Sequence, residues 1–214
     1  MKKLIVLTAA CLFSLAIFAQ SEKYAAAMKD NITAIGPAFK NPSELLALAN
    51  KFERIALAEK NQWLPFYYAA YCEVNYAFMQ EDNSKVDGLA DKATELIKQA
   101  DALQPKNSEV SCIKSMIASS QLMVNPMQRY MEYGQLSQQH LEAAMKQDPN
   151  NPRPEMLIGQ GLKYTPEQFG GGCGPASAKL EASMKKFETF KPASELHPNW
   201  GKEYTQQLID ECKK

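Results

Sequence analysis

One phrase of small residues, a larger apolar residue and a closing proline recurs at a fixed interval in this chain. It is clearest where Ala93, Ile97 and Ala100 share one face of a predicted helix that stops at Pro105. The same offsets return as Ser137, Leu141, Ala144 and Pro149, and in weaker form as Ala49, Glu53, Ala56 and Asn61, with a period of 44 residues. Such a helix cannot bury its apolar stripe alone, so the period predicts helices stacked on one another.

The phrase resembles the second helix of the tetratricopeptide (TPR) repeat. In that family small residues, a bulky apolar residue and a terminal proline fall at the same offsets. The family period is about 34 residues, so each unit here would carry about ten more. The resemblance implies an all-α, TPR-like helical-repeat array (an α-solenoid) of about nine helices. A HEAT-type array, with a period of about 40–47 residues, and an ordinary bundle with a chance repeat are the alternatives.

Apolar periodicity and helix-breaking residues set the expected helix boundaries. The expected helices cover residues 21–35, 42–60, 62–79, 85–103, 108–124, 127–147 with a bend at Gly134, 155–164, 175–190 and 199–212. Nowhere do β-branched and polar residues alternate at the period of a strand, so no sheet is expected.

The first 19 residues are typical of a secretory signal peptide. Lys2 and Lys3 precede an apolar run that reaches Ala19, and at about sixteen residues this run is short for a membrane span. We therefore expect one domain over residues 20–214, with no membrane span in the mature chain and a periplasmic or secreted location. Leu7–Cys11 faintly resembles a lipoprotein box, but the apolar run continues past it.

The charge balance of the mature chain argues against nucleic acid as a partner. Without the signal it holds 22 basic and 24 acidic residues, with no basic block or stripe.

An oxidising compartment permits disulfides among the four mature cysteines. In the repeat arrangement Cys173 begins one helix and Cys212 ends the next, and antiparallel neighbours bring those two ends together. A Cys173–Cys212 bridge is therefore predicted, although three pairings exist for four cysteines. Cys72 and Cys112 fall inside helices and are expected to be buried free thiols.

The predicted helix over residues 62–79 is unusually aromatic. Trp63, Tyr67, Tyr68 and Tyr71 form a candidate groove, because the first helix of each TPR unit lines the inner wall of the array. Tyrosines there would offer flat apolar area with a polar tip to a peptide or small ligand. Packing of the same side chains in the core is the alternative.

The loop Pro166–Gly174 contains a Phe-Gly-Gly-Gly turn. A turn of this kind resembles one in some exported bacterial TPR proteins, including accessory subunits of solute transporters. It lacks the phosphate-loop pattern, so a wide turn between helices with Phe169 tucked into the core is expected.

No pattern of residues predicts catalysis, a metal site or a cofactor. His140 and His197 are far apart in the sequence, and neither belongs to a metal-binding or nucleophile motif. The sequence therefore predicts a binding or scaffolding protein of the bacterial cell envelope that recognises a protein or peptide. A ligand-binding accessory subunit of a solute transporter is the alternative, and an enzyme is the least favoured class.

Overall fold

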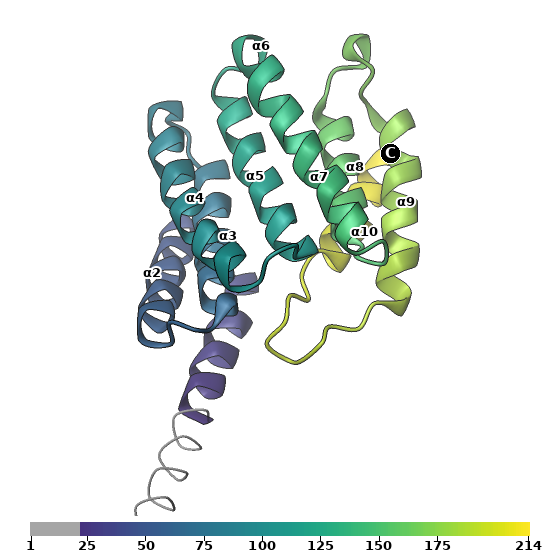
Figure 1. Ribbon diagram of the computed structural model, residues 1–214. Coiled ribbons are helices and arrows are strands. Elements are labelled where there is room, and N and C mark those ends of the chain that lie inside the picture. The colour runs from purple at the N-terminus through teal and green to yellow at the C-terminus, as the bar shows by residue number, and fades with distance from the viewer. Residues whose placement is uncertain (1–21) are drawn as a thin grey trace, which may run out of the picture.

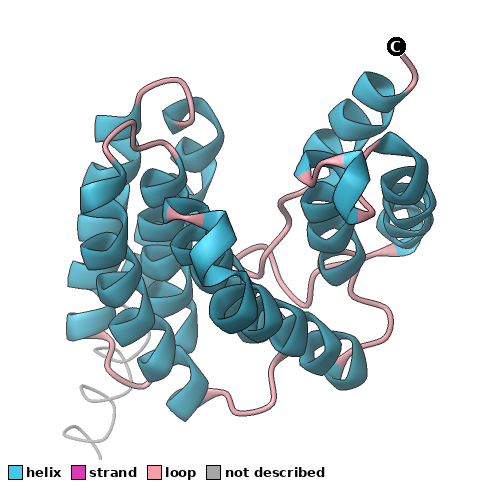
Figure 2. Ribbon diagram, turned by 90° about the horizontal axis from the view of Figure 1, so that it is seen from above, coloured by secondary structure: helices cyan, strands magenta, loops and turns pink. Residues whose placement is uncertain are grey.

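The computed structural model describes residues 22–214, and within this part of the chain every regular element is a helix (Figures 1 and 2). An N-terminal helix covers residues 22–38. It is followed by α2 (Pro42–Ala58), α3 (Trp63–Phe78), α4 (Val86–Leu103), α5 (Ser108–Val124), α6 (Pro126–Arg129), α7 (Gln135–Gln147), α8 (Arg153–Tyr164), α9 (Cys173–Thr189) and α10 (Lys202–Cys212). The predicted signal peptide and Cys11 lie outside the described residues.

Helices that follow one another in the chain pack side by side (Figure 1). α3 lies between α2 and α4, α5 packs on α4 and α7, and α9 packs on α8 and α10. The recurring phrase is buried at equivalent positions in three of these helices. In α2, α4 and α7 the buried members are Ala49, Ala56, Ala93, Ile97, Ala100, Ser137, Leu141 and Ala144.

Among α2–α10, side-chain caps mark the starts of α2, α5 and α6. The side-chain oxygen of Asn41 accepts a hydrogen bond from the Ser43 amide, and Pro42 follows it at the first helical position. Asn107 accepts from the amides of Glu109 and Val110 at the start of α5. Each cap satisfies backbone donors that have no partner inside the helix.

Two expected helices differ from the structure in more than a small shift of their ends, the first for an identifiable reason. The N-terminal helix continues through Gly36 and Pro37 to residue 38, because the burial of Ile35 and Ala38 in the core holds its last turn. The expected helix over residues 127–147 is instead α6, a π-helical turn η2 (Tyr130–Gly134) and α7. Gly134 is therefore the last residue of a π-turn and not a simple bend.

Gly159 permits the close approach of α8 and α9. A Cβ atom added there would lie 2.7 Å from both Cγ and Cδ2 of Leu180, which is fully buried. We expect Gly159→Ala to lower the free energy of unfolding by about 1–3 kcal/mol, the usual cost of overpacking. Gly161 lies in the same helix with open space around it, so Gly161→Ala should raise stability by up to about 1 kcal/mol. Urea denaturation of both variants checks the pair, and equal effects would contradict the packing argument.

Candidate functional site

The segment between α9 and α10, residues 190–201, forms no helix and loops from α9 toward α3 (Figure 1). We call it the connector. Tyr68 on α3 donates a hydrogen bond from its hydroxyl to the carbonyl of Leu196 at 3.0 Å. The indole Nε1 of Trp200 donates to the Tyr67 hydroxyl at 2.8 Å. The connector is therefore attached to a helix that lies more than 100 residues earlier in the chain.

The contacts between α3 and the connector correct the prediction of an aromatic groove. Tyr67 is 0 % exposed, Tyr68 2 % and Tyr71 5 %, while Trp63 is half-buried against Tyr67 and His197. The tyrosine side chains belong to the core because α2, α4 and α5 surround α3 and the connector covers the remaining face. Burial raises the pKa of the Tyr71 hydroxyl well above its ordinary value. These tyrosines therefore pack in the core, as the alternative interpretation of the sequence stated, and they form no open groove.

A buried ion pair, which the sequence did not reveal, joins α8 to α5. Arg153, in the first turn of α8, is completely buried and donates from Nη1 to Oε1 of Glu109 on α5 at 2.8 Å. Glu109 also accepts from Asn151 Nδ2 at 2.8 Å and from the Tyr67 hydroxyl at 3.2 Å. Desolvation raises the pKa of the Glu109 carboxyl, and the charge of Arg153 opposes this effect. Glu109 on α5 thus pairs with Arg153 on α8 and accepts a hydrogen bond from Tyr67 on α3, and these contacts hold the three helices together.

Aromatic rings complete the surroundings of Arg153. Its guanidinium lies 4.9 Å from the ring centroids of both Phe190 and Trp200, and 5.9 Å from that of Phe187. Stacking of this kind stabilises a desolvated arginine. Trp200 also holds the connector against α3, because its ring lies tilted against that of Tyr71 at a centroid distance of 4.8 Å.

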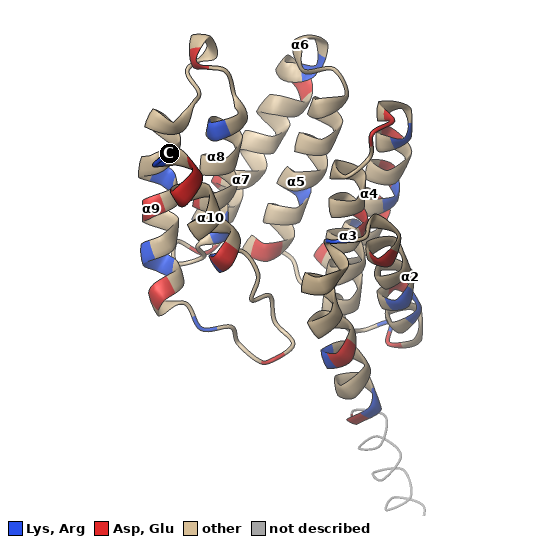
Figure 3. Cartoon of the chain, turned by 180° about the vertical axis from the view of Figure 1, so that it is seen from behind, with Lys and Arg blue, Asp and Glu red and all other residues tan. Residues whose placement is uncertain are grey.

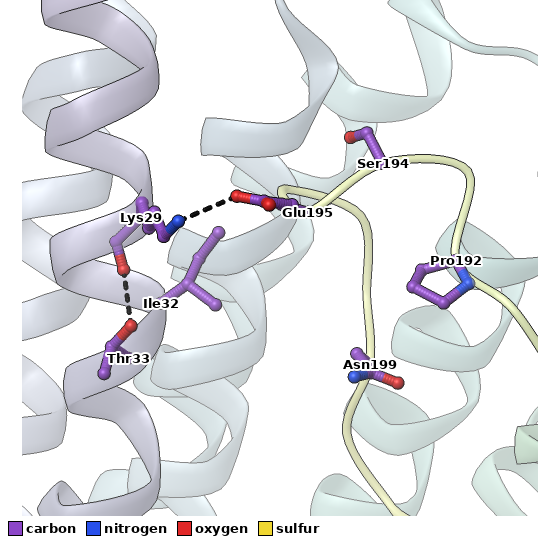
Figure 4. A pocket seen from close by; sticks show the side chains of 7 residues that line it. All are labelled: Lys29, Ile32, Thr33, Pro192, Ser194, Glu195 and Asn199. Carbon is purple, nitrogen blue, oxygen red and sulfur yellow. Dashed lines mark hydrogen bonds and ion pairs between the residues drawn. The ribbon is translucent and has the colours of Figure 1, made fainter.

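A cavity of about 500 Å³ opens between the N-terminal helix and the connector (Figure 4). Lys29, Ile32 and Thr33 line it from the helix. The connector lines it with Pro192, Ser194, Glu195 and Asn199. Its walls are therefore part polar and part apolar, and no aromatic side chain lines them.

A second surface is apolar and lies at the end of the stack that α6 occupies in Figure 1. It consists of Met123, Met127, Tyr130 and Met131, which we call the Met–Tyr surface; their exposed fractions are 59 %, 81 %, 62 % and 70 %. Arg129 holds this segment in place, because its guanidinium bonds both carboxylate oxygens of Asp87 at 2.6 and 2.8 Å. π-turns such as η2 occur frequently at functional sites.

The turn between α8 and α9 lies at the same end of the molecule (Figure 1). Phe169 is 61 % exposed there, so the expectation that it packs in the core was wrong. Gly170 and Gly172 adopt φ values of +82° and +91°, a backbone conformation in which a side chain would be strained. Tyr164, the last residue of α8, is also exposed.

Neither histidine belongs to a metal cluster. Within residues 22–214 no group of three or more His, Cys, Asp or Glu side chains converges on a point that would hold a metal ion. His197 Nδ1 is 2.7 Å from the Ser194 hydroxyl in the connector. His140 is on α7, where burial lowers the pKa of its imidazole.

The remaining features concern cysteines, charge and hydrophobic length. Cys173 and Cys212 form a disulfide in the structure, while Cys72 and Cys112 are buried free thiols. Lysines and arginines are interspersed with acidic residues on the face seen in Figure 3. In the described range no helix has both the length and the apolar character needed to cross a bilayer.

No protein-family model and no curated protein matches this sequence. Among solved structures, the chain is similar to the HusA haemophore from Porphyromonas gingivalis, with 36 % sequence identity and a TM-score of 0.79. The match covers 89 % of this chain and 92 % of that one.

The chain belongs to the HusA family. The all-helical architecture is thus shared with HusA over most of both chains. The TPR resemblance is not tested by this match and stays a prediction.

Proposed function

We propose that this protein is an exported haem-binding protein. The observation that carries the proposal is the 36 % identity to a haemophore over 89 % of the chain. The structure also contains the Cys173–Cys212 disulfide, which is favoured in an oxidising compartment. Together with the predicted signal peptide, this bond supports a periplasmic or extracellular location.

The Met–Tyr surface is the site that suits a tetrapyrrole best. Haem is flat and largely apolar, and this surface offers three flexible thioether side chains and an aromatic ring to solvent. Methionine adapts its shape to an irregular partner, and tyrosine supplies rigid contact area. Large apolar side chains gathered at one exposed place mark a surface that binds a protein, a ligand or a membrane. In proteins generally, tyrosine oxygen and methionine sulfur also serve as axial ligands of haem iron.

Replacement of two methionines tests the site. The double variant Met127→Ser, Met131→Ser should bind haem at least about tenfold more weakly, since each thioether that loses a buried contact costs about 1 kcal/mol or more. Absorbance titration in the Soret region measures the affinity. Both side chains are largely exposed in the free protein, so its melting temperature should stay nearly unchanged.

Leu57→Ser is the matched control, because Leu57 is 60 % exposed on α2, away from this surface. It should leave haem affinity unchanged. Equal affinity of the methionine variant and the parent would place the site elsewhere. Absence of saturable haem binding by the parent would contradict the proposed function itself.

We also propose that the stack is a TPR-like array. Equivalent burial of the recurring phrase in α2, α4 and α7 supports this arrangement. Peptide recognition along the inner wall has lost its support, because the connector occupies the face of α3 that was assigned to it. Recognition of a protein partner remains a second candidate, carried by the exposure of the Met–Tyr surface, and a transporter accessory subunit is one such case. Co-purification of an envelope protein by the parent, lost with Met127→Ser, Met131→Ser, would favour it.

A further inference from the structure

The cavity between the N-terminal helix and the connector is separate in the fold from the Met–Tyr surface. Its two walls come from segments about 160 residues apart in sequence, and they meet through one ion pair (Figure 4). Lys29 Nζ lies 2.8 Å from Oε2 of Glu195, and the two side chains are 63 % and 79 % exposed. Cavities of about 300–1,000 Å³ are the usual size of small-molecule sites, and this one measures about 500 Å³.

The charges of the cavity select the kind of ligand. Hydrogen bonding and attraction between the two groups raise the pKa of Lys29 and lower that of Glu195, so both are charged at neutral pH. A simple anion that approached Lys29 would be repelled by Glu195. A simple cation that approached Glu195 would be repelled by Lys29. A ligand that carries one charge of each sign, a short distance apart, satisfies both groups without breaking their bond.

The neutral lining is compatible with the same chemistry. Figure 4 shows the hydroxyls of Thr33 and Ser194 and the amide of Asn199 around the opening. The Thr33 hydroxyl already donates to the Lys29 carbonyl, and the Ser194 hydroxyl is bonded to His197 Nδ1. The Asn199 amide and the remaining hydroxyl lone pairs supply the hydrogen bonding beside the ion pair. Ile32 and Pro192 supply apolar contact for a side chain. A neutral sugar, by contrast, would gain hydrogen bonds here but no charge–charge contact with Lys29 or Glu195.

We propose that this cavity binds a zwitterionic ligand, namely an α-amino acid or a short peptide. The ligand carboxylate pairs with Lys29, its ammonium group pairs with Glu195, and an apolar side chain rests on Ile32 and Pro192. Binding at this place also ties the connector to the N-terminal helix.

Calorimetric titration with the dipeptide alanyl-leucine tests the proposal on the mature protein. Saturable binding is expected at concentrations up to about 10 mM. N-acetyl-alanyl-leucine, which lacks the ammonium group, and alanyl-leucine amide, which lacks the carboxylate, should each bind at least about tenfold more weakly. Glucose should give no saturable signal. Absence of dipeptide binding, or equal binding of the blocked forms, would overturn the proposal.

Two variants assign the charges. Lys29→Met should remove the discrimination between the dipeptide and its amide, and Glu195→Gln should remove the discrimination against the acetylated form. Both side chains are exposed, so the variants should fold and melt as the parent does. Haem titration of Lys29→Met should match the parent, so a failure at this cavity is distinguishable from a failure of the haem proposal. Unchanged discrimination in both variants would place the dipeptide outside the cavity.

Discussion

Arg153→Met should lower the free energy of unfolding by about 3–5 kcal/mol, because it leaves a buried carboxylate without its cation. Arg153 is completely buried, and Glu109 would keep only the Asn151 and Tyr67 donors. The same change removes the contacts of the guanidinium with Phe190 and Trp200, which help to hold the connector. Chemical denaturation followed by circular dichroism measures the loss.

The loss should also depend on pH in a defined direction. Burial already raises the pKa of Glu109, and removal of Arg153 raises it further. The folded variant then holds a proton more tightly than the unfolded chain does. Stability from this group is present below the ordinary carboxyl pKa and is lost as pH rises through the folded value. The difference between variant and parent should therefore grow as pH rises above the ordinary carboxyl pKa of about 4.3.

Two further variants complete the test of the ion pair. Adding Glu109→Gln to Arg153→Met should cost less than the sum of the two single changes, since the buried charge is then gone. Arg54→Met, a change at an exposed arginine on α2, should stay within about 0.5 kcal/mol of the parent. Additive losses at Arg153 and Glu109 would show that the pair is not coupled.

Replacing both Cys173 and Cys212 by serine should cost about 4 kcal/mol, according to the loop-entropy relation for a bridge of this span. The bond closes a loop with a sequence separation of 39 residues. It fastens α10, a helix of 11 residues whose main neighbour is α9. Thermal and urea denaturation of the double serine variant measure the effect.

A reductant provides the control for the disulfide. Dithiothreitol should destabilise the parent by a similar amount and leave the serine variant unaffected, because Cys72 and Cys112 are already free. Thiol titration of the denatured, unreduced mature protein should find two free thiols. Four free thiols would rule out the bridge.

The local signals in the sequence were sufficient for the helices. Apolar periodicity, the caps Asn41 and Asn107, and the breaks at Pro105 and Asn125-Pro126 predicted most boundaries within a few residues. Boundaries failed where packing opposed the local preference. At Pro37 the burial of the next residue, Ala38, kept the helix intact.

The candidate groove illustrates a different kind of limit. Trp63, Tyr67, Tyr68 and Tyr71 fit an aromatic binding wall and a buried core equally well by type and spacing. The distinction depends on Leu196 and Trp200, which lie about 130 residues away and reach these tyrosines through the connector. The connector has no helical periodicity, so its sequence does not predict which helix it will cover.

The sequence by itself determined an all-helical chain with recurring buried small residues, because those properties depend on neighbours three or four positions apart. Only the tertiary structure decided that Arg153 meets Glu109, that the connector covers one face of α3, and that Met127 and Met131 face solvent. The physical reason is that these outcomes depend on distant segments competing for the same space. The type of a residue and its spacing in the sequence do not specify which distant segment will pack against it.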